Sequence, residues 1–203
     1  MPWKNGGGIT TEIAIGPAGA TLDNFDWRVS VACIETAGPF SSFPGIDRTL
    51  AVLSGAGLTL DIEGRAPLSL HAADNGVAFP GELRVVARLE GAMVKDVNVM
   101  TRRERCHHLF ERVEVVESGR IHCQGDSMLV LLVAGAGVVV SVAAAQALRL
   151  QTYDAILSNA GEDDFSVTAE GTASFCVVHL SSVRPDIAPL GLTGQHAAKD
   201  RPR

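Results

Sequence analysis

The stretch LSGAGLTLDI at residues 53–62 recurs as VAGAGVVVSV at residues 133–142, eighty residues further along the chain. In both copies a Gly-Ala-Gly turn signal precedes five residues that alternate in polarity or are mostly apolar. When residues 50–100 are laid over residues 130–180 without gaps, eleven of the 51 positions are identical, most of them at turns. This register predicts two copies of one structural unit.

The pattern inside each unit predicts β-strands. Short alternating or apolar segments are separated by Gly/Pro-containing turns at residues 79–82 and 159–162, and turns about every 8–12 residues are typical of sandwiches and jelly-roll barrels. We therefore expect an all-β protein with an N-terminal unit over residues 1–102 and a C-terminal unit over residues 103–183. Residues 184–203 are expected to form a loose tail, and Arg102–Phe110 is the one segment where we expect a helix.

Residues 128–147 carry no charge and are long enough to span a bilayer. Two glycines in mid-run, many valines and the absence of a flanking Lys/Arg cluster favour a buried β-hairpin instead, with its turn at Gly135 and Gly137. We expect no membrane partner.

Charge and cysteine usage narrow the class of protein. A net charge of -6 argues against non-specific nucleic-acid binding. The four cysteines form no CxxC pair, and the N-terminus lacks the apolar run of a signal peptide. Reduced thiols and a cytoplasmic location are expected.

Three strands of the first unit carry one apolar and one polar face, because side chains alternate across a strand. The polar positions are Thr10, Glu12, Arg28, Ser30, Asp96 and Asn98. Neighbouring turns or strand ends add Lys4, Asn5, Arg48 and Arg102. For any one strand, the polar face could simply be the side of the sheet that faces solvent. The arginines favour a binding site instead, because a guanidinium group pairs well with a carboxylate. We predict a small-anion site. Trp3 is interpreted either as a wall of that pocket or as a core residue.

The second unit lacks this polar set. In the ungapped alignment Cys176 is aligned with Asp96, Val178 with Asn98 and His179 with Val99. We therefore expect the second unit to serve as a scaffold or as the surface of a homodimer formed through Val-rich edges.

Four sequence blocks, in the same order, resemble the HutD/Ves family: Pro2–Gly8, Phe25–Arg28, Gly38–Arg48 and Asp96–Arg103. The resemblance extends to about Leu180. It implies an RmlC-type cupin fold with two barrels in one chain, a bicupin. It also implies a bacterial cytoplasmic protein that moderates histidine utilisation, with formylglutamate, urocanate or a related acid as ligand and no firmly assigned enzymatic activity.

Other function classes are less favoured. Metal-dependent cupins need two histidines in an HxH arrangement, which this sequence lacks, and the spacing of Cys106, His107, His122 and Cys123 matches no common zinc pattern. We expect no metal and no other cofactor. Metal-independent catalysis on a small carboxylic acid by Lys4, Glu12 or Asp96 stays open, although no nucleophile–base pair is legible. Binding of a small anionic metabolite is the favoured function.

Overall fold

The computed structural model describes residue 3 and residues 7–142, 147–158 and 164–183, and every regular element among them is a strand. The first sheet has the order β1-β2-β9-β4-β7, the second β3-β8-β5-β6, and the third β10-β14-β11-β12, with β13 also paired to β11. The first sheet contains β1 (Gly8–Gly16), β2 (Trp27–Ile34), β4 (Ile46–Gly55), β7 (Val77–Pro80) and β9 (Val94–Arg102). The second contains β3 (Gly38–Pro39), β5 (Leu58–Ile62), β6 (Leu68–Leu70) and β8 (Val85–Leu89). The third contains β10 (Cys106–His122), β11 (Ser127–Val142), β12 (Leu148–Arg149), β13 (Ala155–Leu157) and β14 (Asp164–Ser182).

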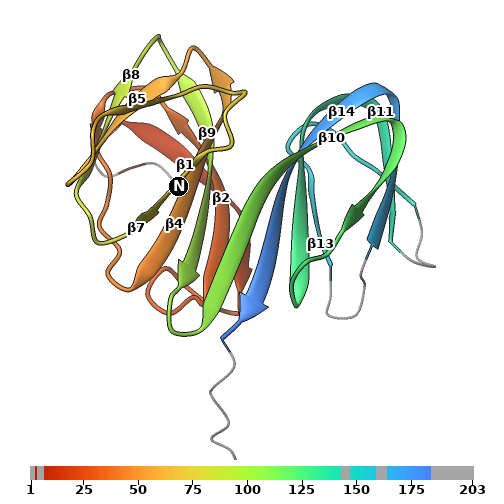
Figure 1. Ribbon diagram of the computed structural model, residues 1–203, viewed down its shortest axis with the longest axis horizontal. Helices are drawn as coiled ribbons and strands as arrows, with labels where there is room; N and C mark the ends of the chain where they lie inside the picture. The colour runs from red at the N-terminus through yellow and green to blue at the C-terminus, as the bar shows by residue number, and fades with distance from the viewer. Residues whose placement is uncertain (1–2, 4–6, 143–146, 159–163, 184–203) are drawn as a thin grey trace, which may run out of the picture.

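Alternation along β4 shows how the core is divided. Leu50 and Val52 point into the cluster between the first and second sheets, together with Leu58 and Leu60 of β5. Ala51 and its same-face neighbours point the other way, into a second cluster shared with the third sheet. The first sheet is therefore covered on both faces, and the chain forms the two lobes seen in Figure 1.

Strand pairing repeats between the two halves. The pairing of Trp27 with Thr101 recurs eighty residues later as His107 with Ser181. Leu58 pairs with Leu70, and the N–H of Leu150 likewise donates to the carbonyl of Val138. The pairing pattern thus supports the predicted duplication, whereas the division into two barrels stays a prediction.

The hairpin expected within residues 128–147 is wrong. β11 is one strand to Val142, and its pairing with β14 shifts register three times between Leu132 and Val139. Gly135 and Gly137 have φ values of 147° and 60°, in a region that favours glycine. These bulges bend the strand without reversing it. Within the described residues, no helix has the length and apolar character needed to cross a bilayer.

The helix expected over Arg102–Phe110 is also wrong. β9 ends at Arg102, the N–H of Arg105 donates to the carbonyl of Arg102 over 2.8 Å, and β10 begins at Cys106. A tight turn therefore joins the two halves. The predicted boundary at residues 102 and 103 falls in this turn, and the predicted tail over 184–203 lies outside the described residues.

Polar side chains of β10 tie the third sheet to the first half. His108 lies between the hydroxyls of Thr49 and Thr101, with nitrogen–oxygen distances of 2.8 and 2.7 Å. Arg112 donates to the carbonyls of Val52 and Asp74. These contacts, with the apolar cluster beneath them, fix the third sheet against the outer face of the first.

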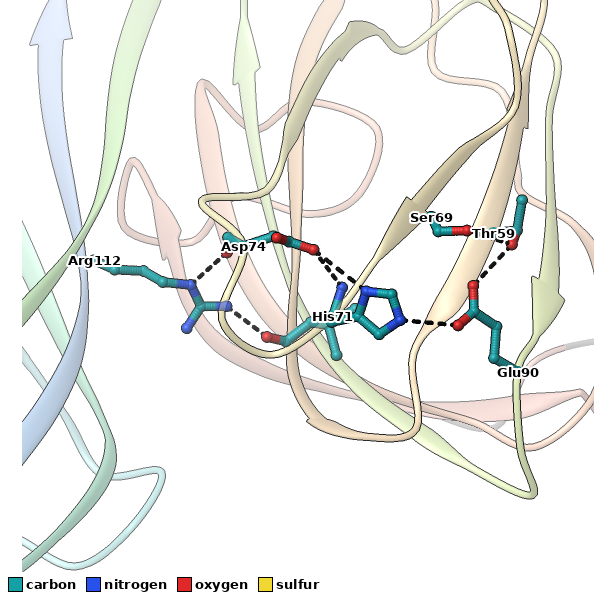
Figure 2. A network of polar contacts seen from close by, with 7 residues as sticks. Thr59, Ser69, His71, Asp74, Glu90 and Arg112 are labelled. Atoms are coloured by element: carbon teal, nitrogen blue, oxygen red, sulfur yellow. Dashed lines mark hydrogen bonds and ion pairs between the residues drawn. The ribbon is translucent and has the colours of Figure 1, made fainter.

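Figure 2 shows the surface network that Arg112 joins. The N–H of His71 donates to the carboxylate of Asp74 over 2.7 Å, and its ring Nε2 lies 2.9 Å from Glu90 Oε2. Glu90 in turn accepts from the hydroxyl of Thr59 over 3.0 Å. The network braces the β6–β7 turn against which Arg112 rests.

His108 predicts an acid-sensitive contact between the halves. Burial lowers its pKa from 6.5 to about 4, with Asp47 opposing this shift and His107 adding to it. Between these pH values the unfolded chain binds a proton at this histidine and the folded chain does not. The free energy of unfolding therefore falls as pH drops from about 6.5 to 4, by up to about 3 kcal/mol.

The variant His108→Gln places an amide group between the two threonine hydroxyls, and this group does not titrate. Urea unfolding across this range is expected to give a flatter pH dependence for the variant; parallel curves would contradict the assignment.

Candidate functional site

A cavity of about 570 Å³ lies on the inner face of the first sheet, opposite the face that packs on the third sheet. Strand alternation places the polar side chains of β1, β2, β4 and β9 here. Turns and the short β3 complete the wall. The lining residues are Trp3, Thr10, Leu22, Arg28, Ser30, Ala32, Pro39, Phe40, Ser41, Phe43, Arg48, Asp96, Asn98 and Met100.

Arg28 is held in a fixed position by two neighbours. Its side chain is 5% exposed, and its Nε donates to Glu12 Oε2 over 2.8 Å. Its Nη1 donates to the hydroxyl of Ser30 over 3.2 Å. Because Glu12 is on β1 and Ser30 on β2, the guanidinium group is oriented by its own strand and by the adjacent one.

Arg48 is held mainly by aromatic rings. Its guanidinium carbon lies 5.1 to 5.5 Å from the ring centres of Phe40, Phe43 and Phe79, an arrangement that stabilises a buried cation. Its Nη1 donates to the carbonyl of Ser41 over 3.1 Å. Burial lowers the pKa of Arg48 to about 10, so the group remains charged at neutral pH.

Three buried polar atoms of this cavity have no hydrogen-bond partner among the described residues: Nε of Arg48, Oδ1 of Asp96 and Oδ1 of Asn98. They are the only atoms of this kind in the part of the chain that the structure describes. Buried polar groups in folded proteins are nearly always paired. Three such atoms around one cavity therefore indicate a place for a polar ligand.

Asp96 has an unusual carboxyl group. It is 2% exposed, and burial raises its pKa from 3.8 to about 7, against the opposing effects of Arg48 and a hydrogen bond with the Ala32 backbone. Its protonation state therefore changes near neutral pH, in the same cavity as two guanidinium groups.

An apolar wall completes the cavity. Trp3 is half-buried, its Nε1 donates to the hydroxyl of Thr10 over 2.7 Å, and its ring meets Phe40 edge-on with centres 6.3 Å apart. Trp3 thus lines the pocket and also packs against the core cluster between the first and second sheets, so it has both predicted roles. The sequence pattern does not identify Phe40 and Phe43 as site residues, because they lie in irregular chain between β3 and β4, where no periodicity assigns a face; the Phe43-Pro44-Gly45 turn is the one local signal.

The structure brings most of the predicted site residues together. Six of the ten line the cavity: Thr10, Arg28, Ser30, Arg48, Asp96 and Asn98. Glu12 contacts it through Arg28. Arg102 lies elsewhere, where its Nε donates to the carbonyl of Phe25 over 3.0 Å and its guanidinium group faces the Phe25 ring. Lys4 and Asn5 lie outside the described residues.

The second half has apolar side chains where the first has its site, but not those that the alignment indicated. Cys176 and Val178 pack in the cluster facing the first sheet, and Phe175 and Val177 fill the inner core of the second half. The cause is a shift of one residue. Leu50 pairs with Asn98, whereas its counterpart Val130 pairs with Val177 instead of Val178. Such a shift turns every following side chain to the opposite face.

Similar proteins match over half of the chain or more. Residues 1–177 match the family model described as HutD. An uncharacterized 21.2 kDa protein in the hutC 3′ region of Pseudomonas putida is 34% identical over 182 residues, covering 90% of this chain and 92% of that protein. Protein Ves of Citrobacter koseri is 42% identical over 105 residues, 51% of this chain and 53% of its own.

Among solved structures, HutD from Pseudomonas fluorescens SBW25, in a formate condition, is 34% identical with a TM-score of 0.74, covering 91% of this chain and 94% of that one. A cupin 2 conserved barrel domain protein from Leptotrichia buccalis is 8% identical with a TM-score of 0.58, covering 85% and 88% of the two chains. The latter likeness concerns the fold alone, and it shows that the all-β architecture is cupin-like.

Asp96 makes folding sensitive to rising pH. Because its folded pKa of about 7 exceeds the ordinary value of 3.8, the folded chain retains a proton that the unfolded chain releases, and stability falls as pH rises from about 4 to 7. The full loss is at most about 4 kcal/mol. Asp96→Asn stays neutral, so its free energy of unfolding relative to the parent should increase over this range. Asp61→Asn, which removes an exposed carboxylate paired with Arg88, is the matched control. The same constant difference for both variants would argue against a protonated Asp96.

Proposed function

This chain belongs to the HutD family, and we propose that it is a metal-free bicupin that binds a small anionic metabolite and thereby modulates histidine utilisation. The binding site is the cavity on the inner face of the first sheet. The observation that carries the proposal is the burial of two guanidinium groups, Arg28 and Arg48, in one cavity where Nε of Arg48 has no partner among the described residues.

The chemistry of the cavity supports an acid as ligand. A guanidinium group binds a carboxylate through paired, charge-assisted hydrogen bonds, and these are strongest where water is excluded. Nε of Arg48 and Oδ1 of Asn98 have no partner among the described residues, so the first can donate to the carboxylate and the second can accept from another polar group of the ligand. The volume of about 570 Å³ suits a small metabolite.

The candidate ligands follow from family membership. Formylglutamate has two carboxylates and an N–H group, and urocanate has one carboxylate and an N–H group. The carboxylates match the arginines, and the N–H group matches Asn98. One relative is described by its place next to hutC. These two facts lead us to propose an acid of histidine breakdown, bound in the cytoplasm.

In this proposal residues 1–102 form the ligand-binding unit, and residues 103–183 form a C-terminal unit that supports it. Phe175 and Val177 fill its interior, so it serves as a scaffold for the first sheet. β10 is an edge strand that pairs with β14 alone in its sheet, and we propose that edges of the third sheet form a homodimer. Nucleic acids and membranes are not proposed as partners.

A second candidate function is metal-independent catalysis on a small carboxylic acid. One observation favours it: burial brings the pKa of Asp96 to about 7, where a carboxyl group transfers protons efficiently. Mass spectrometry of the bound acid after incubation separates the two functions, because an enzyme changes its mass or releases a product while a sensor returns it unchanged.

Ligand binding predicts thermal stabilisation. Formylglutamate, urocanate and formate are the acids to test, and one that binds should raise Tm by about 5–10 °C at a concentration a hundred times its Kd. Arg28→Gln removes one of the two positive charges buried in the cavity, and it should weaken that binding by at least about 30-fold.

Arg88→Gln is the matched control, since it removes an arginine of similar size from an exposed ion pair with Asp61. It should leave the affinity unchanged. Equal affinities of all three proteins for an acid that binds the parent would refute the anion site.

A further inference from the structure

We propose that Asp96 binds the anionic ligand as a neutral carboxylic acid, so that each anion enters the cavity together with one proton. This inference rests on the proposed function and deepens it, because it names the residue and the protonation state that make the cavity accept an anion. No covalent bond changes in the ligand: the proton comes from solvent and resides on the Asp96 carboxyl group.

Asp96 is buried at the wall of the cavity. It is on β9, 2% exposed, and it lines the cavity beside Asn98. Its Oδ1 is without a hydrogen-bond partner in the described ranges of the chain. Burying an ionised carboxylate is costly unless charges and hydrogen-bond donors compensate it. Among hydrogen-bond partners, the Ala32 backbone is the one that contributes to the pKa of Asp96. The free oxygen is therefore better suited to an O–H group that donates to a ligand.

The net charge of the described groups around the cavity depends on whether Asp96 is ionised. The charged side chains that contact or influence this part of the cavity are Arg28 from β2, Arg48 from β4, Glu12 from β1 and Asp96 itself. With Asp96 ionised, two carboxylates neutralise two guanidinium groups, so the described groups present no net charge to an anion. With Asp96 protonated, the described groups carry one net positive charge, which favours an anion.

The protonation state of Asp96 also decides which hydrogen bonds this residue can form with a ligand. An ionised Asp96 can only accept hydrogen bonds, so its Oδ1 would repel the carboxylate oxygen of a ligand held by Arg48. A protonated Asp96 donates to that oxygen, and O–H bonds to a carboxylate are short and strong. Binding and protonation thus favour each other, as thermodynamic linkage requires.

The free protein is suited to this coupling. Burial brings the pKa of Asp96 to about 7, so supplying the proton near neutral pH costs little free energy. Above that value each further pH unit should lower the affinity for the anion about tenfold. The cavity then responds to acid concentration and to pH together.

The test is calorimetric titration with formylglutamate and formate from about pH 6.5 to 9, where free carboxyl groups with a pKa of about 4 stay ionised. Titrations in buffers of different ionisation enthalpy count the protons taken up. We expect about one proton per anion bound above the pKa of Asp96, and an affinity loss of about tenfold per pH unit. Asp96→Asn should bind without proton uptake and with an affinity independent of pH, whereas Asp61→Asn should behave like the parent.

The outcomes separate this inference from the function it rests on. Binding by the parent without proton uptake would overturn the role of Asp96 and leave the anion site standing. So would a stronger affinity at high pH, the result expected if an ionised Asp96 accepts an N–H group of the ligand. If neither acid bound the parent and the acids of the thermal screen also failed, the inference would fall together with the proposed function.

Discussion

Two guanidinium groups lie on one face of a sheet, each exposed by 5% or less, and the rest of the binding region depends on them. A cation buried without compensation would destabilise the fold by several kcal/mol, so each has its own solution. Arg28 takes a carboxylate from the adjacent strand, and Arg48 takes three aromatic rings and a backbone carbonyl. The second solution leaves Nε of Arg48 unused by the described residues, and that donor is what an anion can bind.

Those cations face inward because the other face of the same sheet is occupied. Val29 and Val31 alternate with Arg28 and Ser30, and they pack against the third sheet with Leu129 and neighbouring apolar side chains. A lone sheet with one apolar and one polar face turns the polar face to solvent. Here the second half covers the apolar face, and the second sheet and its loops cover the polar one. The C-terminal half therefore contributes to the site without lining it.

Strand periodicity makes much of this predictable from the sequence. Side chains two apart share a face, and this rule alone groups Arg28 with Ser30 and Asp96 with Asn98, as the cavity lining confirms. The same rule does not apply to irregular chain, so it does not predict that Phe40 and Phe43 line the cavity. It also says nothing about a one-residue shift between strands. That shift, between β11 and β14, is why Phe175 and not Cys176 fills the interior of the second half.

The duplicated Gly-Ala-Gly turn shows how copies with the same local signal diverge. In the first half the chain breaks there, β4 ending at Gly55 and β5 beginning at Leu58. In the second half the same signal only bends β11, which continues to Val142. Glycines permit both outcomes because they allow positive φ without fixing how many residues are unpaired. Neighbouring strands decide: β14 is itself unbroken and pairs with β11 on both sides of the bend. In the first half β8 and β9 are separate strands in two different sheets, whereas in the second half Phe175 and Val177 of the continuous β14 lie in the inner core.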